Sequence, residues 1–193
     1  MDLTQGTDQY KHARAKKMML WFGIISMAMM FAGLTSAYVV SQSRPDWISD
    51  LQLPTAFLYS TLCIVLSSVS IVLAEKAVKK ENRKNATAFL LGTLGLAVAF
   101  IFLQFQGFSE LIANGYYFTG SESSVTASFI YIVVIAHLAH LLGGIVVLFV
   151  LIYKHFKQRY YPGQTLGLEL GATYWHFVDA LWLYLFFFLY FFR

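Results

Sequence analysis

Five long apolar segments, joined by short polar connections, dominate this sequence. They cover residues 18–40, 54–74, 86–106, 125–153 and 170–192. Each supplies the roughly 20 residues that a helix needs to cross about 30 Å of hydrocarbon. Charged residues make up only 12% of the 193 positions, against about 25% in an ordinary soluble domain. The sequence therefore predicts an all-α membrane protein, a bundle of five transmembrane helices that forms one domain over residues 1–193.

The basic residues lie unevenly along the chain, and their distribution predicts the orientation. Twelve precede the first helix or lie in the second and fourth connections: Lys11, Arg14, Lys16, Lys17, Lys76, Lys79, Lys80, Arg83, Lys84, Lys154, Lys157 and Arg159. Five crossings place all of them on one side of the membrane and leave Arg44 and Arg193 on the other. Because Lys and Arg accumulate on cytoplasmic loops, we expect a cytoplasmic N-terminus and a periplasmic C-terminus. This distribution also excludes nucleic acid as the reason for the positive net charge.

Three further features bound the possibilities. No signal peptide is predicted, because residues 1–17 are polar and contain no short apolar run with a cleavage site. The single cysteine, Cys63, lies in an apolar segment, which favours a packing role over a disulfide or a thiolate metal site. Within the longest outer connection, residues 107–124, we expect a short interfacial helix near Ser109–Asn114.

Four ionisable side chains are predicted to lie inside the membrane, where such groups are energetically expensive. His137 and His140 share a face of the fourth helix, and His176 and Asp179 share a face of the fifth, because residues three apart are helical neighbours. Antiparallel packing can bring the two faces together. A structural clamp, a proton relay and a haem or metal site all remain open. The clamp is favoured among the three, and the haem site is the least favoured, because histidines at i and i+3 cannot bind opposite axial positions of one iron.

The fifth segment carries the most specific motif. Gly167 and Glu169 form a G-x-E pair, and after a four-residue spacer the chain reads Y-W-H-F-V-D-x-x-W-L, which includes Trp175 and Trp182. This pattern resembles the closing helix of subunit III of the haem-copper oxidases, which comprise cytochrome c and quinol oxidases. The resemblance covers nearly the whole chain. Its upstream parts are residues 20–38, Leu103-Gln104, and His137-Leu138-Ala139-His140 followed by Gly144.

The chain departs from the family pattern at several points. Family members commonly have seven helices, so the resemblance implies a five-helix bacterial form without the first two, whose space we expect a neighbouring subunit to fill. Met27 stands where the family has a glutamate, which weakens a proton-conducting role. Gly107-Phe108 stands where Glu-Tyr is usual. Leu138 replaces a glycine, which argues against close helix approach at that point.

The resemblance implies a non-redox, accessory subunit of an aerobic terminal oxidase in the bacterial inner membrane. Haem and copper would belong to partner subunits, and this chain would have no catalytic, metal or cofactor residues. It would pack on the catalytic subunit I, stabilise it, bind phospholipid and support proton uptake. Glu169 would act there as a proton antenna or headgroup ligand, although a solvated loop is the simpler interpretation. The alternatives are a nitric oxide reductase component, a self-contained membrane cytochrome and a proton-coupled carrier.

Overall fold

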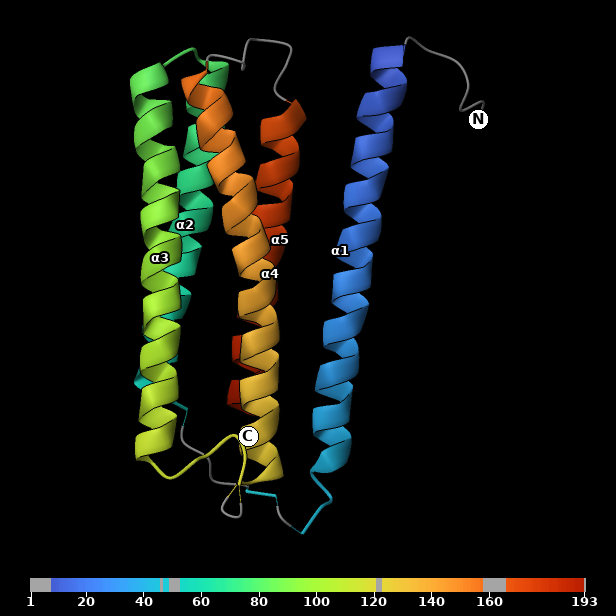
Figure 1. Ribbon diagram of the computed structural model, residues 1–193, viewed down its shortest axis with the longest axis vertical. Coiled ribbons are helices and arrows are strands. Elements are labelled where there is room, and N and C mark those ends of the chain that lie inside the picture. The colour runs from blue at the N-terminus through green and yellow to red at the C-terminus, as the bar shows by residue number, and fades with distance from the viewer. Residues whose placement is uncertain (1–7, 46, 49–52, 121–122, 158–165, 193) are drawn as a thin grey trace.

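Five α-helices run through the computed structural model, which describes residues 8–45, 47–48, 53–120, 123–157 and 166–192 (Figure 1). They are α1 (Asp8–Ser41), α2 (Thr55–Lys79), α3 (Arg83–Ala113), α4 (Val125–Phe156) and α5 (Leu166–Phe191). All five are long and apolar enough to cross a membrane. The predicted all-α class and the five membrane-capable helices are therefore confirmed.

The helices differ from the predicted spans mainly at their ends. α1 already begins at Asp8 and includes the basic residues 11–17, and α2 continues to Lys79. α3 continues past residue 106 to Ala113, so the prediction of a separate helix near Ser109–Asn114 is wrong. The physical reason is that helical hydrogen bonding does not stop where the apolar run stops. A glycine such as Gly107 weakens a helix by about 1 kcal/mol relative to alanine but does not break it.

Two helices start at side chains that satisfy free backbone donors. The Asn85 N–H donates to the Asn82 side chain at the start of α3, over 3.3 Å. The Ala127 N–H donates to the Ser124 hydroxyl at the start of α4, over 3.1 Å. Asparagine and serine are preferred at this position because their side-chain oxygens accept from the first turn of the helix. These caps define where α3 and α4 begin.

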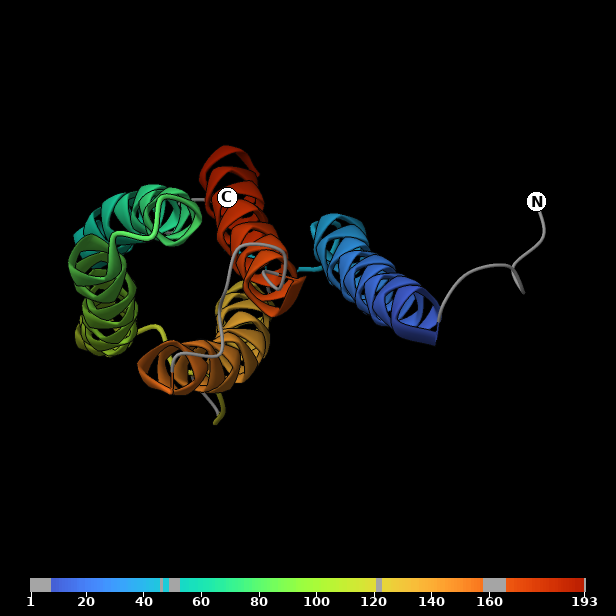
Figure 2. The ribbon, with the colours of Figure 1, turned by 90° about the horizontal axis from the view of Figure 1, so that it is seen from above.

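Helices α2 to α5 form a closed four-helix unit, and α1 lies outside it. Seen from above, α2, α3, α4 and α5 follow one another around a ring (Figure 2). Each contacts the next, α5 contacts α2, and α1 contacts α4 and α5. The core of the unit is formed by large apolar side chains that include Ile64, Leu90, Phe100, Val134 and Trp182. Figure 1 shows α1 approaching the unit at one end and diverging from it at the other.

The basic residues that are predicted to share one side of the membrane lie at one end of the molecule. The starts of α1, α3 and α5 and the ends of α2 and α4 lie together at this end, which we call the basic end (top of Figure 1). It carries Lys11, Lys79, Arg83 and Lys154, among others. Arg159 and Arg193 fall outside the described residues. Helices of alternating direction therefore place lysines and arginines from three distant parts of the chain at the same end of the molecule.

Candidate functional site

Two tryptophans of the sequence motif connect α5 to α2. The Trp175 indole N–H donates to the Ser67 hydroxyl over 2.9 Å, and the Trp182 N–H donates to the Thr61 hydroxyl over 3.0 Å. Both indole rings are fully buried. A buried Trp N–H needs an acceptor, since an unmade hydrogen bond inside the membrane is costly. The seven-residue spacing of the tryptophans keeps both on the face that meets α2.

His176 and Asp179 continue this contact with α2. The His176 Nδ1 lies 2.6 Å from the Ser68 hydroxyl oxygen, and the Ser67 hydroxyl donates to Asp179 Oδ2 over 3.4 Å. Asp179 is only 3% exposed, and its other oxygen, Oδ1, has no hydrogen-bond partner among the described residues. His176 is half-buried. Adjacent serines on α2 therefore meet residues three apart on α5.

The two histidines of α4 point toward different neighbours. His137 is fully buried in the four-helix unit, with ring centroids 5.0 Å from Trp182 and 5.9 Å from Phe100. Its two ring nitrogens have no hydrogen-bond partner in the described part of the chain. The His140 ring packs instead on Phe31 of α1, at 5.6 Å between centroids. Residues three apart differ by about 60° around a helix, which suffices here to separate the unit's interior from α1.

The four predicted residues are therefore distributed over three environments. His176 and Asp179 meet α2, His137 lies inside the unit, and His140 faces α1. Within the described residues, no group of three or more His, Cys, Asp or Glu side chains is arranged to hold a metal ion. The described contacts join His137 and His140 to aromatic rings rather than to each other, so they offer no facing histidine pair of the kind that a bis-His haem needs.

The hydroxyl groups of α2 are the part of the site that sequence reasoning missed. Ser60, Thr61, Ser67 and Ser68 form two pairs with seven-residue spacing, so they lie along one side of α2. Ser60 accepts from the Gln104 amide of α3 over 2.8 Å. The repeated spacing is the signal for these residues in the sequence. It is a weak signal, because serine and threonine are common in membrane helices and bond their own backbone, as Thr61 also does to Phe57.

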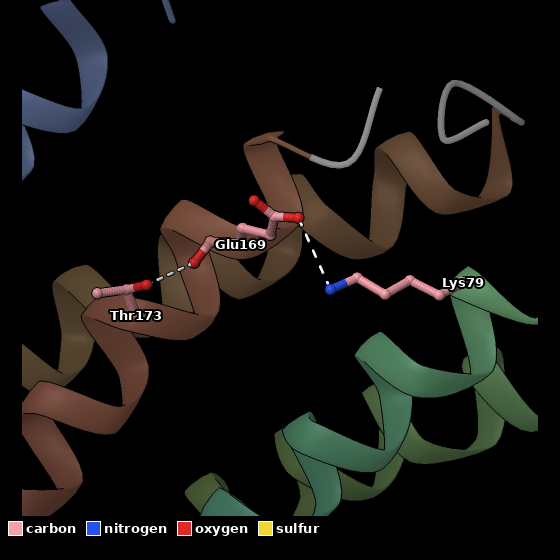
Figure 3. A network of polar contacts seen from close by, with 3 residues as sticks. All are labelled: Lys79, Glu169 and Thr173. Atoms are coloured by element: carbon pink, nitrogen blue, oxygen red, sulfur yellow. Dashed lines mark hydrogen bonds and ion pairs between the residues drawn. The ribbon is translucent and has the colours of Figure 1, made fainter. Parts of the chain in front are cut away.

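At the basic end, Glu169 connects α5 to α2. Its Oε1 lies 3.7 Å from the Lys79 ammonium, and Thr173 donates to its backbone carbonyl over 2.8 Å (Figure 3). The Glu169 and Lys79 side chains are 41% and 56% exposed. Ion pairs this accessible contribute only about 0–1 kcal/mol. Glu169 is therefore placed at the surface of the basic end, in a weak ion pair with Lys79.

Comparison with known proteins identifies the family. Residues 3–193 match the family model described as cytochrome c oxidase subunit III. The chain belongs to the cytochrome c oxidase subunit III family. Membership implies a membrane setting and a complex with other oxidase subunits, in keeping with the five membrane-capable helices.

Similar members of the family come from mammals. Cytochrome c oxidase subunit 3 of Loxodonta africana is 30% identical over 202 residues, which cover 94% of this chain and 73% of the relative. The Equus caballus protein is 31% identical over 179 residues, covering 84% of this chain and 64% of the relative. The Bos taurus protein is 29% identical over 204 residues, with 95% and 74% covered. The chain thus spans between about two thirds and three quarters of the length of these subunit III proteins.

The positions that depart from the subunit III pattern have defined surroundings. Leu138 is a buried core residue, and α4 meets α5 closely at two glycines instead. A Cβ added to Gly144 would lie 3.2 Å from the Trp175 ring, and one added to Gly171 would lie 2.7 Å from Leu151. At Gly107, an added Cβ would collide with the Phe57 ring. Close helix approach in this chain therefore depends on glycines other than the one replaced by Leu138.

Proposed function

We propose that this chain is the non-redox subunit III of a haem-copper terminal oxidase, and that it packs on the catalytic subunit and stabilises it. The observation that carries the proposal is the family match over residues 3–193. The motif residues Trp175, Trp182 and Asp179 support it, because their side chains form hydrogen bonds with α2 and so have a structural role. Haem and copper are assigned to partner subunits, since the buried histidines each contact a different neighbour.

Affinity purification in mild detergent tests this function directly. A tagged chain is expected to retain a haem-containing catalytic subunit that reduces oxygen, and to carry no haem once the subunits are dissociated. Stoichiometric haem on the isolated chain would contradict the proposal and favour a self-contained cytochrome. Retention of a catalytic subunit that reduces nitric oxide instead of oxygen would move the chain to a nitric oxide reductase.

The proposed orientation places the basic end at the cytoplasmic surface of a bacterial inner membrane. Supporting this, twelve lysines and arginines are assigned to that side and two to the other, and such an excess accumulates on cytoplasmic loops. The bacterial membrane is proposed because the sequence resembles the five-helix bacterial form. Fusions of a periplasm-active reporter to the C-terminus are expected to be active, and fusions within the α2–α3 connection inactive. The reverse pattern would overturn the orientation.

Phospholipid binding is proposed along α1. A groove of about 330 Å³ lies between α1 and α5, with Phe31, Ala32 and Tyr184 among its lining residues. Toward the basic end, α1 exposes the apolar side chains Trp21 and Phe22. Acyl chains suit the apolar walls, and lipid phosphates suit the neighbouring lysines. Native mass spectrometry of the purified complex is expected to retain phospholipid. Replacement of Ala32 by leucine, which fills the groove, is expected to reduce it.

Support of proton uptake is proposed for Glu169. Its carboxylate is partly exposed at the basic end and is 3.7 Å from Lys79. If it collects protons for the catalytic subunit, then Glu169→Gln should lower turnover increasingly as pH rises, because protons become scarce. Glu110→Gln, at the opposite end of the molecule, is the matched control and should not change the profile. Unchanged turnover of the Glu169 variant at alkaline pH would contradict this role and indicate that the ion pair with Lys79 is purely structural.

A further inference from the structure

A second groove lies on the outer side of the four-helix unit, between α2 and α5. It measures about 420 Å³. Valine and leucine side chains, such as Val69 and Leu183, form most of its wall, and Lys76 lies toward the basic end of α2. Its location distinguishes it from the groove between α1 and α5, although Ala180 lines both. The outer face of α5 is therefore hollowed on both sides of one small residue.

Three polar residues line this second groove far from either end of the helices. They are Ser68 of α2 and His176 and Asp179 of α5. His176 is ten residues after Leu166, the first residue of α5, which places it roughly 15 Å along a helix of about 39 Å. An apolar groove with a few convergent polar groups is the usual form of a binding site. Here those groups lie at mid-membrane depth.

These polar groups have bonding capacity that the chain itself does not use. The His176 ring contacts Ser68 through Nδ1, and its second nitrogen, Nε2, lies on the other side of the ring, away from that contact. Within the described residues, Ser68 is the one hydrogen-bond partner of His176, which is half-buried. Asp179 Oδ1 also has no partner there, but this oxygen is buried beneath the groove surface, because the residue is only 3% exposed. Unused polar atoms at this depth call for an occupant that can hydrogen-bond.

A neighbouring helix meets this requirement better than a lipid chain. Lys76 suits a lipid phosphate, but the acyl chain below it offers no hydrogen bond to His176. A transmembrane helix can present a hydroxyl or amide at the same depth, and such bonds between helices are common in membranes. Small residues allow helix backbones to approach closely, and Ser68 and Ala180 supply them on the two sides of the groove.

We propose that a transmembrane helix of another oxidase subunit docks in the α2–α5 groove and bonds the half-buried His176 through a hydroxyl or amide side chain. A hydroxyl or an amide can donate or accept a hydrogen bond, so either one can pair with both tautomers of the His176 ring. The inference rests on the proposed function, which supplies the other subunits. It adds which face of this chain they use and which chemistry the docked helix carries at mid-membrane depth.

Photocrosslinking within the intact complex tests the location. The photoreactive residue p-benzoylphenylalanine is placed at Val69 in the groove or at Val98 on α3, two valines that are 53% and 57% exposed. Irradiation at position 69 is expected to join the chain to one other oxidase subunit, through a peptide within a transmembrane helix. Lipid adducts alone at position 69, or the same product in equal yield from position 98, would overturn the docking proposal.

Substitutions in the groove test the chemistry. His176→Leu is expected to weaken retention of the partner subunit about three- to tenfold, the value of one hydrogen bond between membrane helices. His176→Gln keeps a hydrogen-bonding group and should restore retention. Ser70→Ala removes a hydrogen bond from α2 to the Phe89 carbonyl, at a residue that does not line the groove, so it should retain the partner like the wild type. Equal losses for His176→Leu and Ser70→Ala would indicate a general structural role and overturn the chemistry proposed here.

The outcomes also separate this inference from the proposed function. If the unaltered chain co-purifies with no oxidase subunit, the proposed function fails. If it co-purifies but His176→Leu retains its partner fully, the function stands and the docking site is wrong. Far-ultraviolet circular dichroism of each variant in detergent verifies that the helical content is unchanged, so a loss of partner is not a loss of fold.

Discussion

Helix α1 and helix α5 show that hydropathy does not decide burial in this protein. The most apolar part of α1 has the higher mean hydropathy of the two, yet 17% of it is buried, against 39% of the corresponding part of α5. In a membrane, lipid and protein core are equally apolar, so hydrophobicity alone gives no preference for helix contact. What distinguishes α5 is its tryptophan, histidine and aspartate side chains, which find partners on α2.

The attachment of α1 runs from its middle to its end, since its buried apolar side chains are Ile24, Phe31 and Tyr38. Phe31 and Tyr38 are fully buried, and the Tyr38 ring contacts Trp47, Phe129 and Phe188. Nearer the basic end, Met19, Trp21 and Phe22 are exposed. Figure 1 shows the same divergence. The four-helix unit and α1 should therefore respond differently to equivalent substitutions.

The largest contrast is expected between two tryptophans. Trp182→Ala removes ring contacts with Phe57 and Phe100 and the bond to Thr61, so it should lower the unfolding free energy by about 3–5 kcal/mol. Trp21→Ala alters a side chain that is 58% exposed and should stay within about 0.5 kcal/mol of the wild type. Circular dichroism during unfolding of detergent-solubilised protein measures both. Equal losses would contradict the division between α1 and the four-helix unit.

The next effect is expected at Tyr38, whose buried ring attaches α1 to the four-helix unit. Tyr38→Ala should release α1 while leaving the four-helix unit folded, at a local cost of about 3 kcal/mol for a lost buried aromatic ring. Spin labels at Lys17→Cys and Lys154→Cys, in a Cys63→Ala background, should report a broader range of distances. Tyr38→Phe keeps the ring, and the Tyr38 hydroxyl has no described partner, so this control should resemble the wild type. A cooperative loss of all helices in Tyr38→Ala would mean that α1 is part of the unit.

A smaller effect is expected at two glycines of α3. An added Cβ at Gly107 would collide with the Phe57 ring, whereas Gly95 has nothing within 4 Å. Gly107→Ala should therefore cost about 1–3 kcal/mol through overpacking. Gly95→Ala should be neutral or stabilise by up to about 1 kcal/mol, since alanine favours a helix. Thermal unfolding of the two variants side by side provides the measurement, and a stable Gly107→Ala protein would show that Phe57 moves aside freely.

The smallest effect is predicted for the one side-chain hydrogen bond described between α1 and α5. The Thr35 and Tyr184 hydroxyl oxygens are 3.0 Å apart. A double-mutant cycle of Thr35→Val and Tyr184→Phe should give a coupling of about 0.6 kcal/mol, which is typical between membrane helices. The cycle cancels the bonds that Thr35 makes to its own helix backbone. A coupling of several kcal/mol would mean that α1 is attached far more strongly than its burial indicates.

The sequence predicted the candidate site in part. His176 and Asp179 share a helix face by spacing, and the structure places both toward α2. Joining them with His137 and His140 required knowing which helices are neighbours and how each is rotated. In the structure His140 is directed to α1 and His137 to the interior. The rotation of α4 about its axis cannot be predicted from a local sequence pattern, because it depends on packing with three other helices.

The number, order and approximate lengths of the helices followed from the sequence, because crossing hydrocarbon sets a length that each segment must meet alone. The family followed from the spacing in residues 167–183. The tertiary structure decided which helices form the four-helix unit, that α1 diverges from it, and that serines of α2 receive the polar groups of α5. Those outcomes depend on contacts between distant segments. The pattern of apolar residues does not predict them, because lipid and protein core are equally hydrophobic.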